Sequence, residues 1–339
     1  MSTQSARIEW VLSGDRTKAS SRLQGFLIHE WLVRQGVSSH VAATDFNRIG
    51  SIWSRAFIDV ASALSRSAAT HVVFEAPEWP MVTLARLCSR QGKRVLAVRC
   101  DRIPERFDEY FDATILPTEG LRQALGVERG IVIDDACEVP EGLFKRDYRQ
   151  RGGKLKVGWV GHSGYRDYIV DFVARLRKSS RIDRDFEFEL ISSGDFATRQ
   201  WSIDGVFADV LACDIAILPL PSGEWFQNKS SNRLIMMHAL GMPVIASLIP
   251  SYRALARHGA NGLYVGRDDE FETCLETMRN PERREALGTQ ARHDLGSRYA
   301  LQSIGAKWQS AIIGTCAANP DRLRPNPKLL AFNAMLRLL

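Results

Sequence analysis

The sequence predicts an α/β protein made of two parallel-sheet domains, one after the other along the chain. Apolar runs of about four to eight residues alternate with segments of helical period, which is typical of strand–helix units stacked into parallel sheets. This alternation runs through the first half of the chain and starts again in the second. The length of 339 residues suits two domains of roughly 150 residues each.

The first domain, residues 1–148, is expected to contain a parallel sheet. Its strands correspond to the apolar runs at 8–13, 40–43, 71–75, 94–99, 113–116 and 130–133. Apolar residues with helical spacing lie between these runs, for example in 21–35 and 80–90. Strands that alternate with helices in this way predict a Rossmann-like domain.

The second domain, residues 149–296, repeats the pattern. Its expected strands are 155–160, 186–192, 215–218, 243–247 and 262–265, and its expected helices are 165–178, 230–240, 252–258 and 270–278. The preceding segment, 140–156, is rich in glycine and charge and has no apolar period. We therefore place the junction between the domains there.

The end of the chain, 297–339, is expected to form a last helix followed by a basic and apolar tail. Residues 283–313 have helical character with an interruption near Gly296. The final residues, LLAFNAMLRLL, fit a docked terminal helix or, as an alternative, a weak contact with the inner face of a membrane. No apolar run approaches the roughly 18 residues of a membrane span, and the start does not resemble a signal peptide. We expect a cytoplasmic protein.

The charge balance favours an anionic partner without indicating nucleic acid. Lys and Arg number 45 against 39 Asp and Glu, a net charge of +6, but no basic block or nucleic-acid-binding motif occurs. The six cysteines are far apart, and none has the spacing of a zinc site. We therefore expect reduced thiols, no metal site and no cofactor. P-loop and nucleophile-elbow motifs are missing from the sequence as well.

A glycine-rich turn follows the expected strand at 155–160 and leads into a helix. Glycines such as Gly161 let the backbone approach a ligand closely, and the amides from Ser163 onward could point at a phosphate near the helix N-terminus. His162 could contact a diphosphate or a sugar hydroxyl. The spacing G-x-x-G-x-x-G is not the dinucleotide fingerprint, so an ordinary strand-to-helix turn with a polar His162 stays open.

Two cations mark the start of the helix expected at 230–240. Asn228 or Ser230 can cap this helix, and Lys229 and Arg233 are four residues apart, so they share a face. A cation in the first turn opposes the helix dipole by about 0.3–1 kcal/mol. Two such cations favour a nearby anion, for which a phosphate is suitable. The alternative is that Lys229 extends into solvent and Arg233 pairs with an acid.

The loop after the first expected strand combines small, basic and hydroxyl residues. Gly14, Arg16 and Arg22 lie in it beside Asp15, and the loop leads into a helix that Ser20 could cap. It either contacts substrate or forms a solvated turn. Asp15 is a candidate base, although acids in such loops also serve as caps.

Residues 229–247 (KSSNRLIMMHALGMPVIAS) follow 212–220 (ACDIAILPL) and resemble the donor-binding half of GT-B glycosyltransferases of the group 1, family 4-like type. The likeness includes 158–161 (GWVG) and extends more loosely over 154–313, whereas the first half is only compatible. The resemblance implies two Rossmann-like domains facing across a cleft, with the last helix crossing back to the first domain. It also implies a nucleotide-sugar donor on the C-terminal domain, an acceptor on the N-terminal domain and no obligatory metal.

The same resemblance suggests roles for individual residues. Lys229 and Arg233 match the family's diphosphate-binding cations, and Gly161 and His162 match its glycine loop. Fixed cations of this kind stabilise the charge that develops on a leaving diphosphate. Many members carry a glutamate for the ribose hydroxyls at the position of Met236, and a thioether does not accept such bonds well, which puts the ribose contact in doubt.

The expected activity is a metal-independent, hexosyltransferase-type transfer from a nucleotide sugar to a glycan, lipid-linked or protein acceptor, with retention implied by the resemblance. The expected donor-binding residues are Gly161, His162, Ser163, Lys229, Ser230 and Arg233. The catalytic candidates are Lys229, Arg233, His162 and Asp15, and the acceptor-side loop contains Gly14, Arg16 and Arg22. Two alternatives remain, a nucleotide-sugar epimerase on the same frame and a non-catalytic binding subunit.

Overall fold

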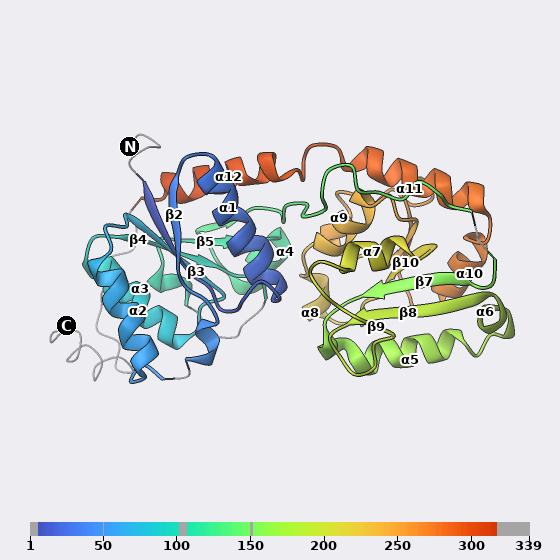
Figure 1. Ribbon diagram of the computed structural model, residues 1–339, viewed down its shortest axis with the longest axis horizontal. Helices are drawn as coiled ribbons and strands as arrows, with labels where there is room; N and C mark the ends of the chain where they lie inside the picture. The colour runs from blue at the N-terminus through green and yellow to red at the C-terminus, as the bar shows by residue number, and fades with distance from the viewer. Residues whose placement is uncertain (1–5, 50, 102–106, 150–151, 317–339) are drawn as a thin grey trace. The chain divides into compact units, whose positions relative to one another are not determined.

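We describe the protein from a computed structural model, which covers residues 6–49, 51–101, 107–149 and 152–316. The chain forms two compact units (Figure 1). The N-terminal unit runs to Ala136 and takes up the chain again from Leu301, and the C-terminal unit is Cys137–Ala300. Each unit is an α/β structure around one parallel sheet, which confirms the predicted fold class.

The sheet of the N-terminal unit has the strand order β2-β1-β3-β4-β5-β6. Its strands are β1 (Arg7–Val11), β2 (Ser38–Ala43), β3 (His71–Glu75), β4 (Arg94–Val98), β5 (Ala113–Leu116) and β6 (Gly130–Val132). The helical segments between them are η2 (Ser21–Phe26), α1 (Leu27–Arg34), η3 (Phe46–Arg48), α2 (Arg55–Arg66), α3 (Trp79–Arg90), η4 (Asp108–Tyr110) and α4 (Glu119–Leu125). All neighbouring strands are parallel.

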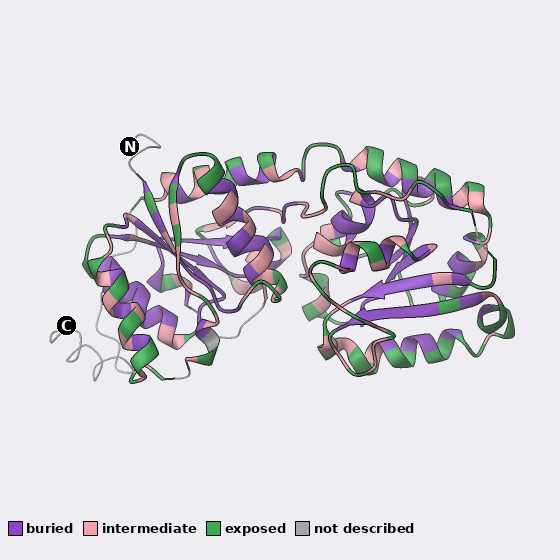
Figure 2. Ribbon diagram, in the orientation of Figure 1, coloured by how far each residue is buried: buried purple, intermediate pink, exposed green. Residues whose placement is uncertain are grey.

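Helices cover both faces of this sheet, as a parallel sheet requires. α2 and α3 pack on one face, where Val72 and Phe74 of β3 join their core. α1 and α12 (Leu301–Gly314) pack on the other face with Val73 of the same strand. Figure 2 shows that most strand residues are buried while the outer sides of the helices are exposed.

The last helix, α12, belongs to the N-terminal unit, which confirms the predicted return of the chain. Its Trp308 ring lies 6.2 Å from the ring of Trp10 in β1. Gln302 accepts a hydrogen bond from the indole of Trp31 at 3.0 Å. The preceding helix, α11 (Pro281–Leu295), ends at Gly296, whose φ of +54° favours glycine. The predicted interruption near Gly296 is therefore confirmed.

The C-terminal unit has the strand order β12-β11-β10-β7-β8-β9. The strands are β7 (Leu155–Val160), β8 (Phe186–Ser192), β9 (Arg199–Gln200), β10 (Ile215–Leu218), β11 (Val244–Ser247) and β12 (Leu263–Val265). The helical segments, besides α11, are η5 (Ser163–Tyr165), α5 (Arg166–Leu176), α6 (Ser180–Asp185), α7 (Val206–Leu211), α8 (Glu224–Gln227), α9 (Asn232–Ala239), η6 (Pro250–Tyr252) and α10 (Glu270–Thr277). Counted from β7, this is the order 3-2-1-4-5-6 of dinucleotide-binding sheets.

Two details differ from the prediction. The expected helix at 252–258 is wrong: a 3₁₀ turn occupies Pro250–Tyr252, and the chain then turns through Gly259, whose φ is +77°, to a bridge between His258 and Gly262. The expected junction at 148/149 also differs from the observed division after Ala136. The segment that follows Ala136 packs on the C-terminal unit, where the Lys145 amide donates to the Leu240 carbonyl at 2.8 Å.

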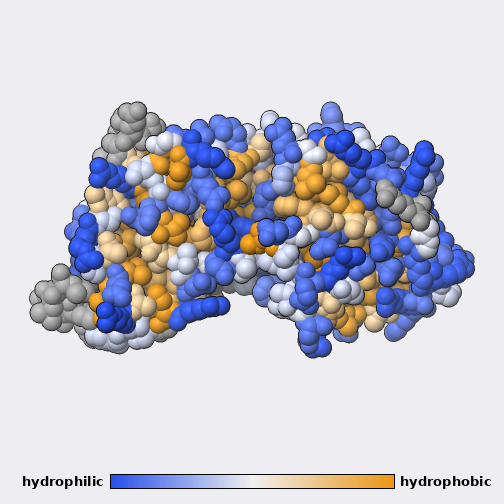
Figure 3. All heavy atoms as spheres, viewed as in Figure 1, coloured by the Kyte–Doolittle hydropathy of each residue, from blue (hydrophilic) through white to orange (hydrophobic). Residues whose placement is uncertain are grey.

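Hydrophilic residues cover much of the face shown in Figure 3, with smaller hydrophobic areas between them. Among the described residues, the exposed large hydrophobic side chains are Val33, Trp53, Val132, Leu143, Val170, Trp225 and Leu248. Trp225 is 40% exposed and belongs to α8.

Candidate functional site

The sheet of the C-terminal unit reverses its strand order between β7 and β10. Successive strands after β7 continue to one side as β8 and β9, whereas β10, β11 and β12 lie on the other. In open α/β sheets, ligands bind at the carboxyl ends of the strands beside such a reversal. The two segments that leave this edge are the glycine turn after β7 and the segment between β10 and α9. The predicted donor-binding residues lie in these two segments, except Arg233, which lies in the first turn of α9.

Packing against Trp159 explains why the glycine turn has a glycine at position 161. A Cβ atom at Gly161 would lie 2.2 Å from the Trp159 ring, so only glycine fits there. The Gly161 amide donates to the Ile191 carbonyl at 3.2 Å, which holds the turn against β8. Nδ1 of His162 accepts a hydrogen bond from the Gly164 amide at 3.0 Å and caps η5. His162 therefore has a structural role through Nδ1, and its exposed ring leaves Nε2 for other contacts.

The two predicted cations lie at the start of α9. Lys229 precedes the helix, and its Nζ lies 4.8 Å from the centroid of the Trp225 ring. Arg233 is in the first turn of α9 and is half-buried. In the part of the chain that the structure describes, Arg233 forms no ion pair with a carboxylate, which removes the alternative of an acid partner for it within these residues. Ser230, which lies between Lys229 and Arg233 in the sequence, is half-buried.

Tyr165 brings these segments together. Its ring centroid lies 6.0 Å from that of Phe226 in α8, and the guanidinium carbon of Arg233 lies 5.8 Å from the same Tyr165 ring. The glycine turn, in which Ser163 is half-buried, is therefore close to Arg233 within one unit. Sequence reasoning missed Tyr165, and the only signal was an aromatic residue directly after the last glycine of the turn.

A second tyrosine lies near the same cation. Tyr252 in η6 is buried, and burial raises the pKa of its hydroxyl, while Arg233 beside it acts in the opposite direction. The guanidinium is thus held among tyrosines at the edge of the core. These two partners are neutral, so they do not compensate the charge of Arg233.

Met236 is part of the core. Its side chain is 8% exposed and packs in the apolar cluster that includes Leu234, Ile235 and Met237. The position that carries a glutamate in many proteins of the resembled family therefore offers no polar contact here. A ribose, if bound, has to be held by other groups.

The predicted acceptor-side loop lies in the N-terminal unit and is held by its own contacts. The Asp15 carboxylate accepts hydrogen bonds from the Thr17 hydroxyl and amide, and these bonds lower its pKa. Arg16 pairs with Glu30 and lies over a phenylalanine ring. Arg22 donates to the Arg16 carbonyl at 3.1 Å. The Gly14 amide donates to the Ser21 hydroxyl at 3.1 Å.

These contacts make the loop a folded turn. A carboxylate with a lowered pKa is a weaker proton acceptor, so Asp15 is poorly suited to act as a base.

Within the described ranges, no three His, Cys, Asp or Glu side chains gather in a way that could hold a metal ion. No described helix is long and apolar enough to cross a membrane. The cysteines are free thiols, and burial raises the pKa of Cys88 and Cys213 to about 12.

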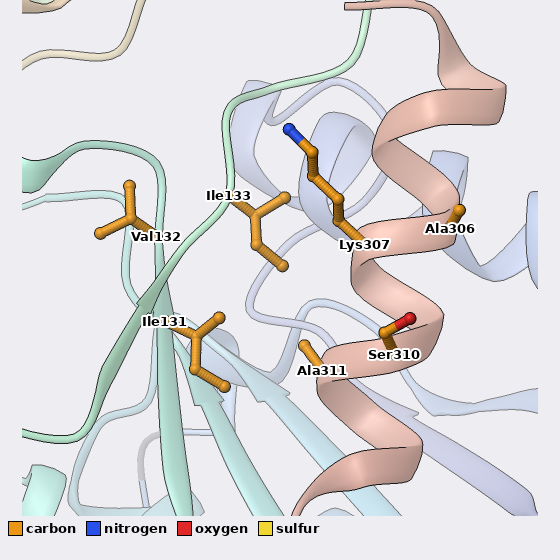
Figure 4. Close-up of a pocket in the computed structure, with 7 residues that line it drawn as sticks. All are labelled: Ile131, Val132, Ile133, Ala306, Lys307, Ser310 and Ala311. Carbon is orange, nitrogen blue, oxygen red and sulfur yellow. The ribbon is translucent and has the colours of Figure 1, made fainter. Parts of the chain in front are cut away.

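A groove of about 580 Å³ lies in the N-terminal unit between β6 and α12 (Figure 4). Ile131 and Ile133 line one wall, and the side chains of Lys307 and Ala311 lie on the facing helix. The predicted site residues do not line it. Its walls are mainly apolar, and Lys307 is the titratable group among the residues that line it, so we assign no chemistry to this groove.

Comparisons with known proteins extend the description of the fold. No protein-family model matches the sequence, and no curated protein matches it. Solved structures do match in fold. HepE from Anabaena, solved with UDP and glucose, is 12% identical, and the match covers 91% of this chain and 99% of HepE with a TM-score of 0.62.

Two further structures match over nearly their whole length. Sucrose-phosphate synthase from Thermosynechococcus elongatus is 11% identical, covering 91% of this chain and 98% of that one, with a TM-score of 0.63. A glycosyltransferase from Rickettsia africae is 10% identical, covering 92% and 100%, with a TM-score of 0.60. The chain has the two-sheet GT-B fold that these proteins share.

Proposed function

We propose that the protein is a glycosyltransferase that transfers a hexose from a nucleotide diphosphate sugar to a hydroxyl acceptor. The observation that carries the proposal is the position of Arg233, which has no carboxylate partner among the described residues and lies beside the glycine turn at the reversal of the sheet. The similarity to HepE, which was solved with UDP and with UDP-glucose, supports a uridine diphosphate sugar as the donor.

The proposed chemistry depends on charge at the leaving group. When the bond from the sugar to the diphosphate breaks, negative charge builds up on the diphosphate. We infer that Lys229 and Arg233, together with the backbone amides of Ser163 and its neighbours, stabilise that charge. Fixed donors of this kind contribute about 2.7–4 kcal/mol each to the lowering of a barrier. We propose that these cations supply the charge that a metal ion supplies in other transferases.

The acceptor remains a hydroxyl on a glycan, a lipid-linked sugar or a protein. We propose transfer with retention, as the family resemblance implies. We assign His162 to the diphosphate or to a sugar hydroxyl through Nε2, because Nδ1 is occupied by the cap. We leave Asp15 out of the proton transfer because of its lowered pKa.

Consumption of UDP-hexoses by the full chain tests this proposal. Release of UDP from UDP-glucose, UDP-galactose and UDP-N-acetylglucosamine is measured with a panel of glycan, lipid-linked and peptide acceptors. We expect one donor to be consumed, and Arg233→Ala to lower the rate by about 10²–10³-fold. Arg181→Ala, which removes an exposed arginine of α6, serves as the matched control. No consumption of any donor, or equal rates for both variants, would contradict the proposal.

A further inference from the structure

Glu75 is a wholly buried carboxylate at the end of β3. Its side chain is 0% exposed. Oε2 accepts hydrogen bonds from the Ser13 amide at 3.0 Å, from the Ser13 hydroxyl, and from the Ser21 hydroxyl at 2.8 Å. Oε1 is also buried, yet it has no hydrogen-bond partner among the described residues. A buried acceptor without a partner destabilises the folded state, so this oxygen needs an explanation.

The carboxylate lies where the sheet of the N-terminal unit reverses. β1 is flanked by β2 on one side and β3 on the other, and the later strands continue beyond β3. Ser13 follows β1, and Glu75 closes β3. Both therefore lie at the carboxyl ends of the two strands that flank the reversal, which is the usual ligand position in such sheets.

A third group connects this carboxylate to the surface. Nζ of Lys18 donates to the Ser13 hydroxyl at 2.5 Å, and the Lys18 side chain is partly exposed. The contacts Lys18–Ser13 and Ser13–Glu75 thus connect the surface to Oε2 of the buried carboxylate, the oxygen beside the unpartnered Oε1.

The backbone after Glu75 is held in an unusual conformation. Ala76 has a φ of +48°, a backbone conformation that is strained for a residue with a Cβ. Its amide donates to the Val98 carbonyl at 2.8 Å, so the backbone directly after Glu75 is bonded to β4. The surrounding structure holds Glu75 in one place at the expense of backbone strain.

We propose that Glu75, Ser13 and Lys18 form a hydroxyl-binding subsite for a sugar ring of the acceptor, an inference that rests on the proposed function. Oε1 of Glu75 accepts the hydrogen of one hydroxyl, and Lys18 donates to the oxygen of a neighbouring hydroxyl. Oε1 is covered in this structure, so the proposal includes a change in the half-exposed Lys18 side chain, which leaves the Ser13 hydroxyl as the ring enters.

The chemistry of the three groups selects this ligand. Each sugar hydroxyl both donates and accepts a hydrogen bond, so adjacent hydroxyls suit an acceptor oxygen beside an ammonium group. A phosphate would be repelled by the Glu75 carboxylate. A hydrocarbon would leave Oε1 without a partner.

Saturation-transfer NMR on the full chain with p-nitrophenyl α- and β-hexosides tests the subsite. The informative variant is Glu75→Gln, because the amide carbonyl keeps the bonds from Ser13 and Ser21 while the amide nitrogen replaces Oε1 and cannot accept a hydrogen. We expect wild type to bind at least one hexoside and Glu75→Gln to raise its Kd tenfold or more. Glu78→Gln, the same change at an exposed position nearby, is expected to bind as wild type does.

A second variant and a second ligand keep the result unambiguous. Lys18→Met changes a half-exposed side chain and removes its bond to the Ser13 hydroxyl. It is expected to weaken binding of the same hexoside, which covers the case in which Glu75→Gln fails to fold. UDP binding, measured on the same samples, is expected to be unchanged in both variants. If wild type binds UDP but no hexoside, or if folded Glu75→Gln and Lys18→Met bind the hexoside normally, the subsite is overturned and the proposed function stands. If wild type binds no UDP, the proposed function itself fails.

Discussion

The guanidinium carbon of Arg233 lies 5.8 Å from the centroid of the Tyr165 ring. This contact joins the first turn of α9 to the turn that follows β7, although the two residues are far apart in the sequence. Tyr165, which contacts Arg233, directly follows the glycine turn with its backbone amides. The turn and the cation therefore lie close together in the C-terminal unit.

The glycine turn is expected to depend on Gly161 for folding. Gly161→Ala places a methyl group 2.2 Å from the Trp159 ring, and overpacking of this kind costs about 1–3 kcal/mol. The midpoint of thermal unfolding is expected to fall by several degrees. Gly266→Ala is the control, because a Cβ there meets nothing within 4 Å. Equal midpoints for the two variants would contradict the packing described for this turn.

The docking of α12 is expected to depend on Gly305. A Cβ at this position would lie 2.3 Å from the Trp31 ring. We expect Gly305→Ala to destabilise the N-terminal unit by about 1–3 kcal/mol, measured as a lower urea midpoint. Gly314→Ala lies on the same helix with nothing within 4 Å of its Cβ, and it is expected to leave the midpoint unchanged. A tolerated Gly305→Ala would mean that α12 does not pack against Trp31.

The free energy of unfolding is expected to decrease as the pH is lowered, because His238 is buried. Burial lowers the pKa of this imidazole to about 4, and its Nε2 contacts the Tyr264 hydroxyl at 2.9 Å. Above the unfolded-state pKa of about 6.5, the ring is neutral in both states and has no effect. As the pH falls from about 6.5 toward 4, only the unfolded chain takes up the proton, so the folded state loses about 3 kcal/mol.

Denaturant unfolding at a series of pH values checks this dependence. His238→Gln is expected to flatten the decline between pH 6.5 and 4. His40→Gln, at a side chain that is 75% exposed, is expected to retain it. A wild-type free energy of unfolding that stays constant over this interval would be evidence against a neutral buried His238.

A glutamate at position 236, where many members of the resembled family carry one, is expected to destabilise the fold. Met236 is 8% exposed in an apolar cluster, so Met236→Glu places an unpaired charge in the core, which costs several kcal/mol. We expect a large drop in the thermal midpoint and no gain in UDP affinity. Met236→Leu keeps the volume and is expected to cost less than about 1.5 kcal/mol. Tighter UDP binding by Met236→Glu would show that position 236 faces the nucleotide.

The fold was predictable because its signals are local. Apolar runs of about four to eight residues predict the strands, segments of helical period predict the helices, and Gly296 marks the break before α12. The helix expected at 252–258 was wrong because Gly259 adopts a positive φ and closes a turn instead. The division after Ala136 was hidden because polar residues such as Lys145 satisfy their hydrogen bonds on the C-terminal unit, which composition does not reveal.

The candidate site was predictable only in part. Lys229, Arg233 and the glycine turn are recognisable from their spacing and from a family resemblance. Tyr165 and the partners of Glu75 are not, because they depend on tertiary contacts: Ser13 and Glu75 are 62 residues apart. For the same reason, the sequence shows an acid at position 15 but not that Thr17 occupies its carboxylate.

The central claim is that Arg233 binds a nucleotide diphosphate, and calorimetric titration of UDP and uridine into wild type and Arg233→Ala tests it most directly. A lost hydrogen bond to a charged group costs about 1.5–3 kcal/mol, or roughly 10–100-fold in Kd. The account predicts that loss for UDP in Arg233→Ala and an unchanged affinity for uridine, which has no phosphates. Equal UDP affinity in the two proteins, or weakening of both ligands alike, would contradict it.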